Sequence, residues 1–149
     1  MDVVSVNWWA VIVAAIVKYA LGAIWYQPLF GKQWRALMGV PEGSRPEGFT
    51  TALIVGAITD LIMAYILARF IVHYTPISVG SGLLVGFLAW IGFMATISLG
   101  QVFYEKKPFT LWLINNSYLL LSLLIMGAII GWWHGGEMAA AAPAPAATP

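Results

Sequence analysis

Long apolar runs separated by short polar segments dominate the chain. Four of these runs, residues 4–26, 49–72, 77–103 and 109–133, are long enough to cross a bilayer as helices. A hydrocarbon core requires about 20 apolar helical residues, and a helix satisfies its own backbone hydrogen bonds there. The pattern therefore predicts an all-α, polytopic membrane protein, a bundle of four transmembrane helices forming one domain over residues 1–137.

The ends of the predicted spans carry residues that are typical of a membrane interface. Seven of the eight tryptophans, all but Trp90, lie near a span end, where their amphipathic rings contact lipid headgroups. The connections at residues 73–76 and 104–108 are short, so the helices that they join are expected to be antiparallel neighbours. Pro76 and Pro108 are expected where the next helix starts, because a missing N–H costs nothing there.

The first connection, residues 27–48, is longer and contains a distinctive loop motif. Trp34, Leu37 and Met38 in it have the i, i+3, i+4 spacing of a short amphipathic helix lying on the membrane surface. An irregular loop is an equal alternative, because glycine and proline surround the segment. The residues of the loop motif are Pro28, Phe30, Gly31, Lys32 and Trp34.

Two further segments bear on the domain organisation. Residues 138–149 contain mainly Ala and Pro, a low-complexity composition that predicts a disordered tail. Residues 21–26 (LGAIWY) resemble residues 99–104 (LGQVFY), and a tryptophan follows each at the same offset. This similarity favours a parallel repeat of a two-helix hairpin, with chance similarity between apolar segments as the alternative.

Composition agrees with a membrane location and excludes several classes of protein. The chain is 61% hydrophobic and 9% charged, whereas soluble domains are about 45–50% apolar and about 25% charged. The net charge of +1 offers no basic surface for nucleic acid. The absence of cysteine excludes disulfides and thiolate metal sites.

The basic residues are distributed unevenly between the two sides of the predicted bundle. Five lie in the first and third connections, and Arg69 lies near the opposite side. The positive-inside rule therefore predicts that these two connections are cytoplasmic and that both termini lie on the outer side of the membrane. The five residues are Lys32, Arg35, Arg45, Lys106 and Lys107.

Two ionisable residues lie deep inside the predicted spans. Lys18 and Asp60 are about 12 and about 16 Å from the inner ends of their helices, at 1.5 Å per residue. Each would cost about 2.5–3.5 kcal/mol alone at the membrane centre, and both share a helix face with small residues, so an intramembrane ion pair is predicted. The pair either fixes the packing of the two helices or takes up a proton or a polar solute. Alternatively, Lys18 extends to the headgroups without a partner.

Polar residues in the inner halves of spans three and four form a second cluster. With the ion pair they are predicted to line a cavity that opens towards the cytoplasm, although simple interhelical hydrogen bonds are an alternative. Small residues at Gly82/Gly86, Gly92/Thr96/Gly100 and Gly127/Gly131 have the four-residue spacing that favours close packing of these two helices. The members of the polar cluster are Thr96, Ser98, Gln101, Asn115 and Asn116.

The sequence contains no recognisable catalytic or cofactor-binding motif. It lacks GxSxG, HExxH and a glycine-rich phosphate loop. His73 and His134 lie at the outer ends of two spans and are expected to be solvated. The expectation is therefore no enzyme activity, no catalytic residue, no metal site and no cofactor.

Three stretches resemble a family of small bacterial membrane proteins known as domain of unknown function 1761. They are residues 6–8 (VNW), 21–34 (LGAIWYQPLFGKQW) and 103–118 (FYEKKPFTLWLINNSY), followed by Met126 and Gly127. The chain departs from the family pattern at Gln27, where a small residue is expected, and at Lys18, where an apolar one is expected. The resemblance implies the four-span architecture and assigns no catalytic residue.

These features support two hypotheses about function. The first is a non-enzymatic accessory or interaction subunit, which contacts the lipid bilayer and either a second copy of itself or a partner membrane protein. The second is a small transporter or ion-coupled permease that uses the polar cluster in the cytoplasmic half of the bundle. A polar substrate path inside a membrane requires ionisable or hydrogen-bonding side chains that face the bundle interior, and both hypotheses depend on where those side chains lie.

Overall fold

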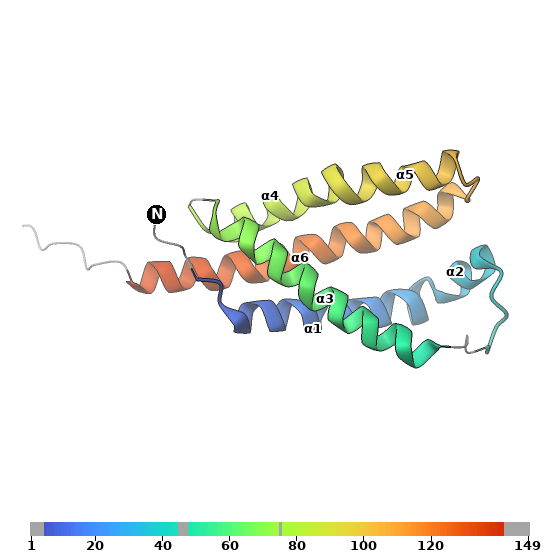
Figure 1. The fold of residues 1–149 in the computed structure, drawn as a ribbon, viewed down its shortest axis with the longest axis horizontal. Helices are drawn as coiled ribbons and strands as arrows, with labels where there is room; N and C mark the ends of the chain where they lie inside the picture. The colour runs from blue at the N-terminus through green and yellow to red at the C-terminus, as the bar shows by residue number, and fades with distance from the viewer. Residues whose placement is uncertain (1–4, 45–47, 75, 142–149) are drawn as a thin grey trace, which may run out of the picture.

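The structure is a computed structural model that describes residues 5–44, 48–74 and 76–141. Within these ranges the chain forms helices and no strand, and the helices build an elongated bundle (Figure 1). The elements in chain order are α1 (Trp8–Ile24), the π-helical turn η1 (Trp25–Leu29), α2 (Gly31–Met38), α3 (Phe49–Val72), α4 (Val79–Ala89), the π-helical turn η2 (Trp90–Ala95), α5 (Thr96–Phe103) and α6 (Phe109–Ala141).

Four helical segments are long and apolar enough to cross a membrane: Trp8–Leu29, Phe49–Val72, Val79–Phe103 and Phe109–Ala141. The prediction of an all-α bundle with four transmembrane helices is therefore confirmed. The last helix includes residues 138–141 of the expected tail, because alanine has the highest helix propensity. Residues 142–149 and Arg45 lie outside the described residues.

Side-chain caps fix the starts of α1 and α4. The Asn7 side chain accepts hydrogen bonds from the backbone N–H groups of Trp9 (2.8 Å) and Ala10 (3.2 Å) at the start of α1. Ser78 and Ser81 form a reciprocal capping box at the start of α4. Pro76 therefore precedes the cap instead of occupying the first turn, whereas Pro108 directly precedes α6.

The short helix in the first connection is present as α2, so the prediction of a helix there is confirmed over the alternative of an irregular loop. Gly39 ends it with a left-handed backbone conformation (φ 68°), which glycine adopts without steric cost. The Trp34 ring packs edge-on against Tyr26 of η1, with 5.7 Å between the ring centroids. Helix α2 thus lies over the end of the bundle opposite to the start of α1 (Figure 1).

The closest packing in the bundle is between α4 and α6. A Cβ atom added at Gly82 would overlap the backbone carbonyl of Gly127, and one added at Gly86 would overlap that of Leu123. The same holds for Gly131 against Ser78. The glycine pairs at 82/86 and 127/131 therefore bring the two backbones together, as their spacing predicts.

The small-residue run at Gly92, Thr96 and Gly100 does not take part in this packing, so the prediction for it is wrong. A Cβ added at Gly92 would meet nothing within 4 Å, and Thr96 is exposed. The cause is η2, because a π-helical turn contains more residues than an α-helical turn and shifts the faces of the helix that follows. As a result Ile97 is 73% exposed, while Ser98 turns towards α6.

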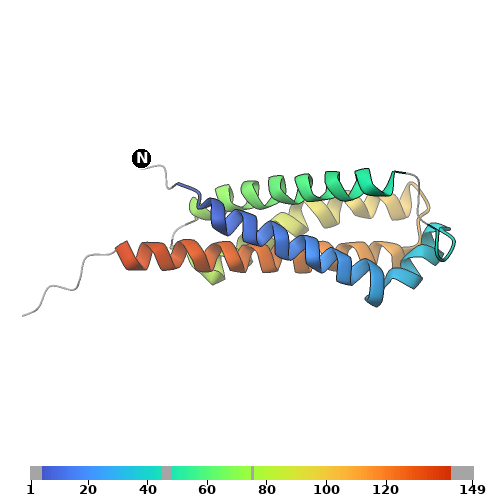
Figure 2. The same ribbon diagram turned by 90° about the horizontal axis from the view of Figure 1, so that it is seen from below.

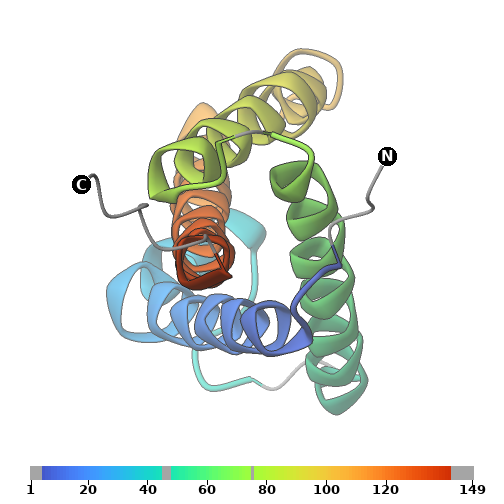
Figure 3. The same cartoon turned by 90° about the vertical axis from the view of Figure 1, so that its left-hand side faces the viewer.

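Seen from the end, α6 lies beside α4 and α1, and α3 packs across α1 (Figure 3). Helix α1 begins and α6 ends at the same end of the bundle (Figure 2). Helix α3 diverges from α5 towards the other end, where α2 lies (Figure 1). In this first half of α3 the apolar side chains are exposed, namely Phe49, Leu53, Ile54, Val55 and Ile58.

Candidate functional site

The structure brings Lys18 of α1 and Asp60 of α3 into direct contact. Lys18 Nζ donates a hydrogen bond to Asp60 Oδ1, and the two residues are 5% and 7% exposed. Small residues next to Lys18 on α1 allow the approach, since Ala14 is fully buried and Ala15 is 7% exposed. Lys18 is therefore paired inside the bundle and does not extend towards the headgroups.

Tyr118 of α6 is the third member of this group, and the sequence reasoning did not single it out. Its hydroxyl lies 3.3 Å from Lys18 Nζ and 3.4 Å from the backbone oxygen of Lys18. The ammonium also lies 5.3 Å from the centre of the Tyr118 ring, a cation–π distance. Gly22 leaves the room for this side chain, because a Cβ there would stand 2.9 Å from the Tyr118 hydroxyl.

One signal in the sequence points to Tyr118. Most other tyrosines lie near the ends of the spans, whereas Tyr118 is well inside α6. A tyrosine hydroxyl buried at that depth needs a hydrogen-bond partner from another helix. The signal does not say which helix supplies the partner, so only the folded bundle identifies Lys18.

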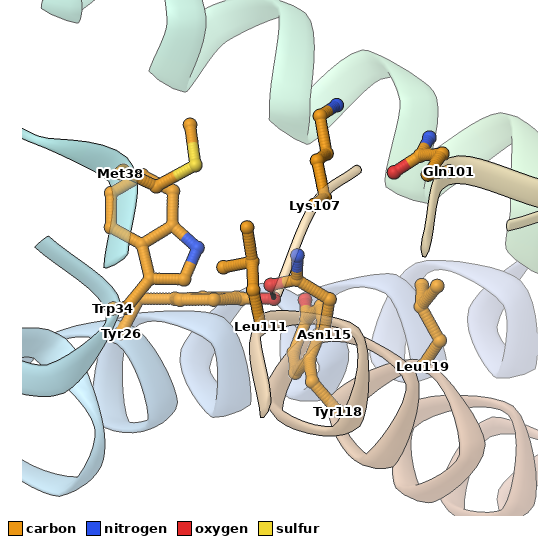
Figure 4. A pocket seen from close by; sticks show the side chains of 9 residues that line it. All are labelled: Tyr26, Trp34, Met38, Gln101, Lys107, Leu111, Asn115, Tyr118 and Leu119. Carbon is orange, nitrogen blue, oxygen red and sulfur yellow. Dashed lines mark hydrogen bonds between the residues drawn. The ribbon is translucent and has the colours of Figure 1, made fainter. Parts of the chain in front are cut away.

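A cleft of about 550 Å³ lies next to Tyr118, at the end of the bundle near α2. Trp34 and Met38 from α2 stand on one side of it and Gln101 and Lys107 on the other, with α6 between them (Figure 4). Tyr26 donates a hydrogen bond of 2.9 Å to Asn115 Oδ1 in its wall. The lining residues are Tyr26, Trp34, Met38, Gln101, Lys107, Leu111, Asn115, Tyr118 and Leu119.

A second cleft of about 200 Å³ adjoins the first along α6. Leu111, Asn115 and Leu119 line both clefts, and their spacing of four residues places them in one row on the helix. Gln101 and Lys107 also line both. The two clefts therefore form one elongated depression along this row, and we call it the α6 cleft.

The predicted polar cluster separates into three parts. Gln101 and Asn115 line the α6 cleft. Ser98 Oγ lies 3.1 Å from Asn116 Oδ1 and accepts from Trp112 Nε1 at 3.0 Å, so Ser98 and Asn116 form interhelical hydrogen bonds while also lining the second part of the cleft. Thr96 is not brought to the cluster, because η2 turns it outwards, where its hydroxyl donates to the backbone oxygen of Gly92 (2.8 Å).

The loop motif forms the turn that carries α2 to the α6 cleft. Pro28 lies within η1, and Phe30 packs on Trp25 with 4.7 Å between the ring centroids. A Cβ at Gly31 would stand 2.6 Å from the backbone oxygen of Tyr26, so glycine is needed there. Trp34 reaches the cleft, whereas Lys32 points to solvent with its Nζ 4.0 Å from Glu42 Oε1.

The two histidines differ, and the expectation that both are solvated is wrong for His134. His134 is 2% exposed, and its Nε2 accepts the backbone N–H of Asn7 at 2.9 Å. The Asn7 side-chain amide also donates to Glu137, so both residues near the end of α6 hold the start of α1. His73 is exposed and lies against its own helix, 2.6 Å from the backbone oxygen of Arg69.

Within the described part of the chain no group of three or more His, Cys, Asp or Glu side chains is placed to hold a metal ion. The polar side chains that line the α6 cleft include tyrosine, asparagine, glutamine and lysine, which form hydrogen bonds and charge contacts.

Comparison with known families identifies the chain. Residues 9–131 match the model of a family described as protein of unknown function (DUF1761). The chain belongs to this family. The DUF1761 match includes Lys18, Asp60, Tyr118 and the whole lining of the α6 cleft, and it ends before His134. No curated protein and no solved structure matches the chain.

Proposed function

We propose that this DUF1761 protein is a small transporter without enzymatic activity, which binds a solute in the α6 cleft and couples its movement to the Lys18–Asp60 pair. The observation that carries the proposal is the position of Tyr118. Its side chain lines the cleft, and its hydroxyl contacts Lys18 Nζ. Ionisable residues inside a membrane protein often mark a substrate or proton pathway, and Tyr118 connects this pair to the cleft.

The coupling follows from the cost of an unpaired charge in the membrane. When Asp60 takes up a proton, Lys18 loses its counter-charge, and a lone ammonium there costs about 2.5–3.5 kcal/mol. Tyr118 already contacts this ammonium and faces the cleft. A solute with an acceptor group in the cleft then compensates the charge, so that protonation of Asp60 and solute binding favour each other.

We also propose that the α2 end of the bundle faces the bacterial cytoplasm, across the inner membrane. Lys32, Arg35, Lys106 and Lys107 lie at this end, and Arg69 lies near the opposite one. The positive-inside rule then assigns both ends of the bundle's chain to the outer side. Reporter fusions after Lys107 and after Ala141 should report cytoplasmic and periplasmic locations, respectively. A cytoplasmic signal after Ala141 would reverse the orientation.

Flux measurements in reconstituted vesicles test the transport proposal. Vesicles loaded with a pH-sensitive dye receive an inward proton gradient, with potassium and valinomycin holding the potential at zero. Amino acids, sugar phosphates and alkylsulfonates are added outside one at a time. We expect at least one of them to accelerate proton entry, and Asp60→Asn to lower that flux at least about tenfold, since its amide cannot ionise.

Two further variants make this test specific. Tyr118→Phe keeps the ring but removes the hydroxyl that contacts Lys18, and it should lower the flux while the protein stays folded. Thr59→Val is the matched control, because Thr59 is exposed and bonds only to its own helix, at the Gly56 backbone oxygen. Equal solute-driven fluxes in Asp60→Asn and the wild type would contradict the proposal.

An accessory or interaction subunit is the second candidate function. The observation that favours it is the first half of α3, where a row of apolar side chains is exposed at the α2 end of the bundle. A second copy or a partner membrane protein packing there would cover this surface. Purification in mild detergent followed by mass measurement tests it, and a stoichiometric protein partner together with no solute-driven flux would favour this candidate over the transporter.

A further inference from the structure

The charges and shape of the α6 cleft restrict what it can bind. Among the described residues that line it, Lys107 is charged and none is acidic. The Lys107 ammonium lies 2.8 Å from Glu105 Oε2, but Glu105 belongs to the connection and does not line the cleft. A lysine ammonium carries three N–H donors, so donors remain for a second anion at the mouth of the cleft.

Away from Lys107 the lining of the cleft is mainly apolar, interrupted by Asn115 and by Ser98 and Asn116 at its side. Gln101 and Lys107 stand at the end of the bundle, and the row of Leu111, Asn115 and Leu119 continues along α6 towards the membrane interior. From Phe109, where α6 begins, to Leu119 the helix rises by about 15 Å. Trp34 and Met38 supply a further apolar wall at the same end. The depression therefore combines one cationic end with a trough in which apolar side chains predominate.

The depth of the cleft matches that of a lipid-like molecule. Lys107 precedes the first turn of a span, at the level where lysine contacts headgroups. The trough runs from there into the region of the hydrocarbon core. No described residue of α3 lines the cleft, and the neighbouring half of α3 diverges from the bundle (Figure 1). A molecule already dissolved in the membrane would thus reach the trough without crossing water.

We propose that the α6 cleft binds a single-chain anionic amphiphile, with its acidic head at Lys107 and its apolar chain along Leu111 and Leu119. This inference goes beyond the proposed function, because the acidic head at Lys107 lies at the mouth of the cleft, away from the Tyr118–Lys18 contact on which the coupling rests. Gln101 supplies an additional polar contact for the head, whereas Asn115 Oδ1 already accepts a hydrogen bond from the Tyr26 hydroxyl. The negatively charged head binds the Lys107 ammonium, and the chain fills the trough.

Quenching of tryptophan fluorescence tests this binding directly. A dodecanoate brominated on the carbon next to its carboxylate is titrated into the full-length protein in a neutral, mild detergent, since bromine quenches a nearby indole and Trp34 lines the cleft at the Lys107 end. We expect saturable quenching that is largely lost in Trp34→Phe. The brominated alcohol of the same chain length should bind about tenfold more weakly, which is the loss expected for one charge-assisted hydrogen bond.

Two lysine variants locate the head of the amphiphile. Lys107→Gln should weaken dodecanoate binding by about tenfold, whereas Lys106→Gln is the matched control, because Lys106 is the adjacent residue and does not line the cleft. Both lysines are exposed, so both variants should keep the wild-type melting temperature. Equal weakening by the two variants, or equal binding of the acid and the alcohol, would overturn the inference.

The outcome separates this inference from the transport proposal. Saturable, Lys107-dependent quenching without any Asp60-dependent flux would keep the binding site and remove the transporter. Absence of saturable quenching, together with an Asp60-dependent flux of another solute, would overturn the amphiphile and leave the transporter standing.

Discussion

Gly82→Ala should destabilise the bundle more than other substitutions of a small residue in the described spans. The new methyl group would meet the backbone carbonyl of Gly127, and neither backbone can move without separating α4 from α6. We expect a loss of about 3 kcal/mol in the free energy of unfolding, the upper end of the usual cost of overpacking. Unfolding by a denaturing detergent, followed through helix content, measures this loss.

Gly92→Ala on the same span is the matched control. A Cβ at Gly92 meets nothing within 4 Å, and alanine favours a helix by about 1 kcal/mol over glycine. This variant should therefore be as stable as the wild type or slightly more stable. Equal destabilisation by the two variants would mean that the glycines act through helix propensity and not through the contact between α4 and α6.

Asp60→Leu should be the most destabilising single change in the Lys18–Asp60 pair. It leaves the buried Lys18 ammonium without its counter-charge, with only Tyr118 nearby. Removing one partner of a buried pair typically costs about 3–5 kcal/mol. Lys18→Met should have a similar effect through the unpaired carboxylate of Asp60, and the same detergent unfolding measures both variants.

The double variant Lys18→Met/Asp60→Leu distinguishes an ion pair from two independent contributions. With both charges removed and apolar groups in their place, stability should return to within about 1 kcal/mol of the wild type or exceed it. Additive losses in the double variant would show that the two side chains do not stabilise the bundle through each other. If the transport proposal holds, the flux of the double variant should nevertheless be absent, because the residue proposed to carry the proton has been replaced.

The sequence predicted the spans and the partners of the buried charges for definite physical reasons. Lipid requires long, uninterrupted apolar helices, so the bounds of α3, Phe49–Val72, coincide with the expected ones. Lys18 and Asp60 were paired because their depths agree and because an isolated charge is expensive in a membrane. The lipid environment determines both features, and its requirements are visible in the order of residues.

Features that depend on local backbone geometry were not predictable in this way. The π-helical turn η2 inserts an additional residue into its turn, so Thr96 faces outwards while Ser98 faces α6. The apolar and polar residues around Trp90–Ala95 do not indicate where such a turn occurs. Without it, the polar cluster was assigned one member too many.

Contacts between distant segments were the other omission. The buried His134 accepts a hydrogen bond from the backbone N–H of Asn7, although the two residues are 127 positions apart. The contact of Tyr118 with Lys18 spans 100 positions. In both cases the side chain is amphipathic, and its ordinary place is the interface. Burial then depends on the partner, which the pattern of a single span does not contain.

The hydrogen bonds of Asn7 have a consequence for biogenesis. The backbone N–H and the side-chain amide of Asn7 donate to His134 and Glu137, which are synthesised 127 and 130 residues later. While the ribosome is still making the intervening segments, the start of the first inserted helix is therefore held by the Asn7 side-chain cap alone. Insertion of the last helix supplies both partners of Asn7, so the start of α1 should become fully anchored only once α6 is in place.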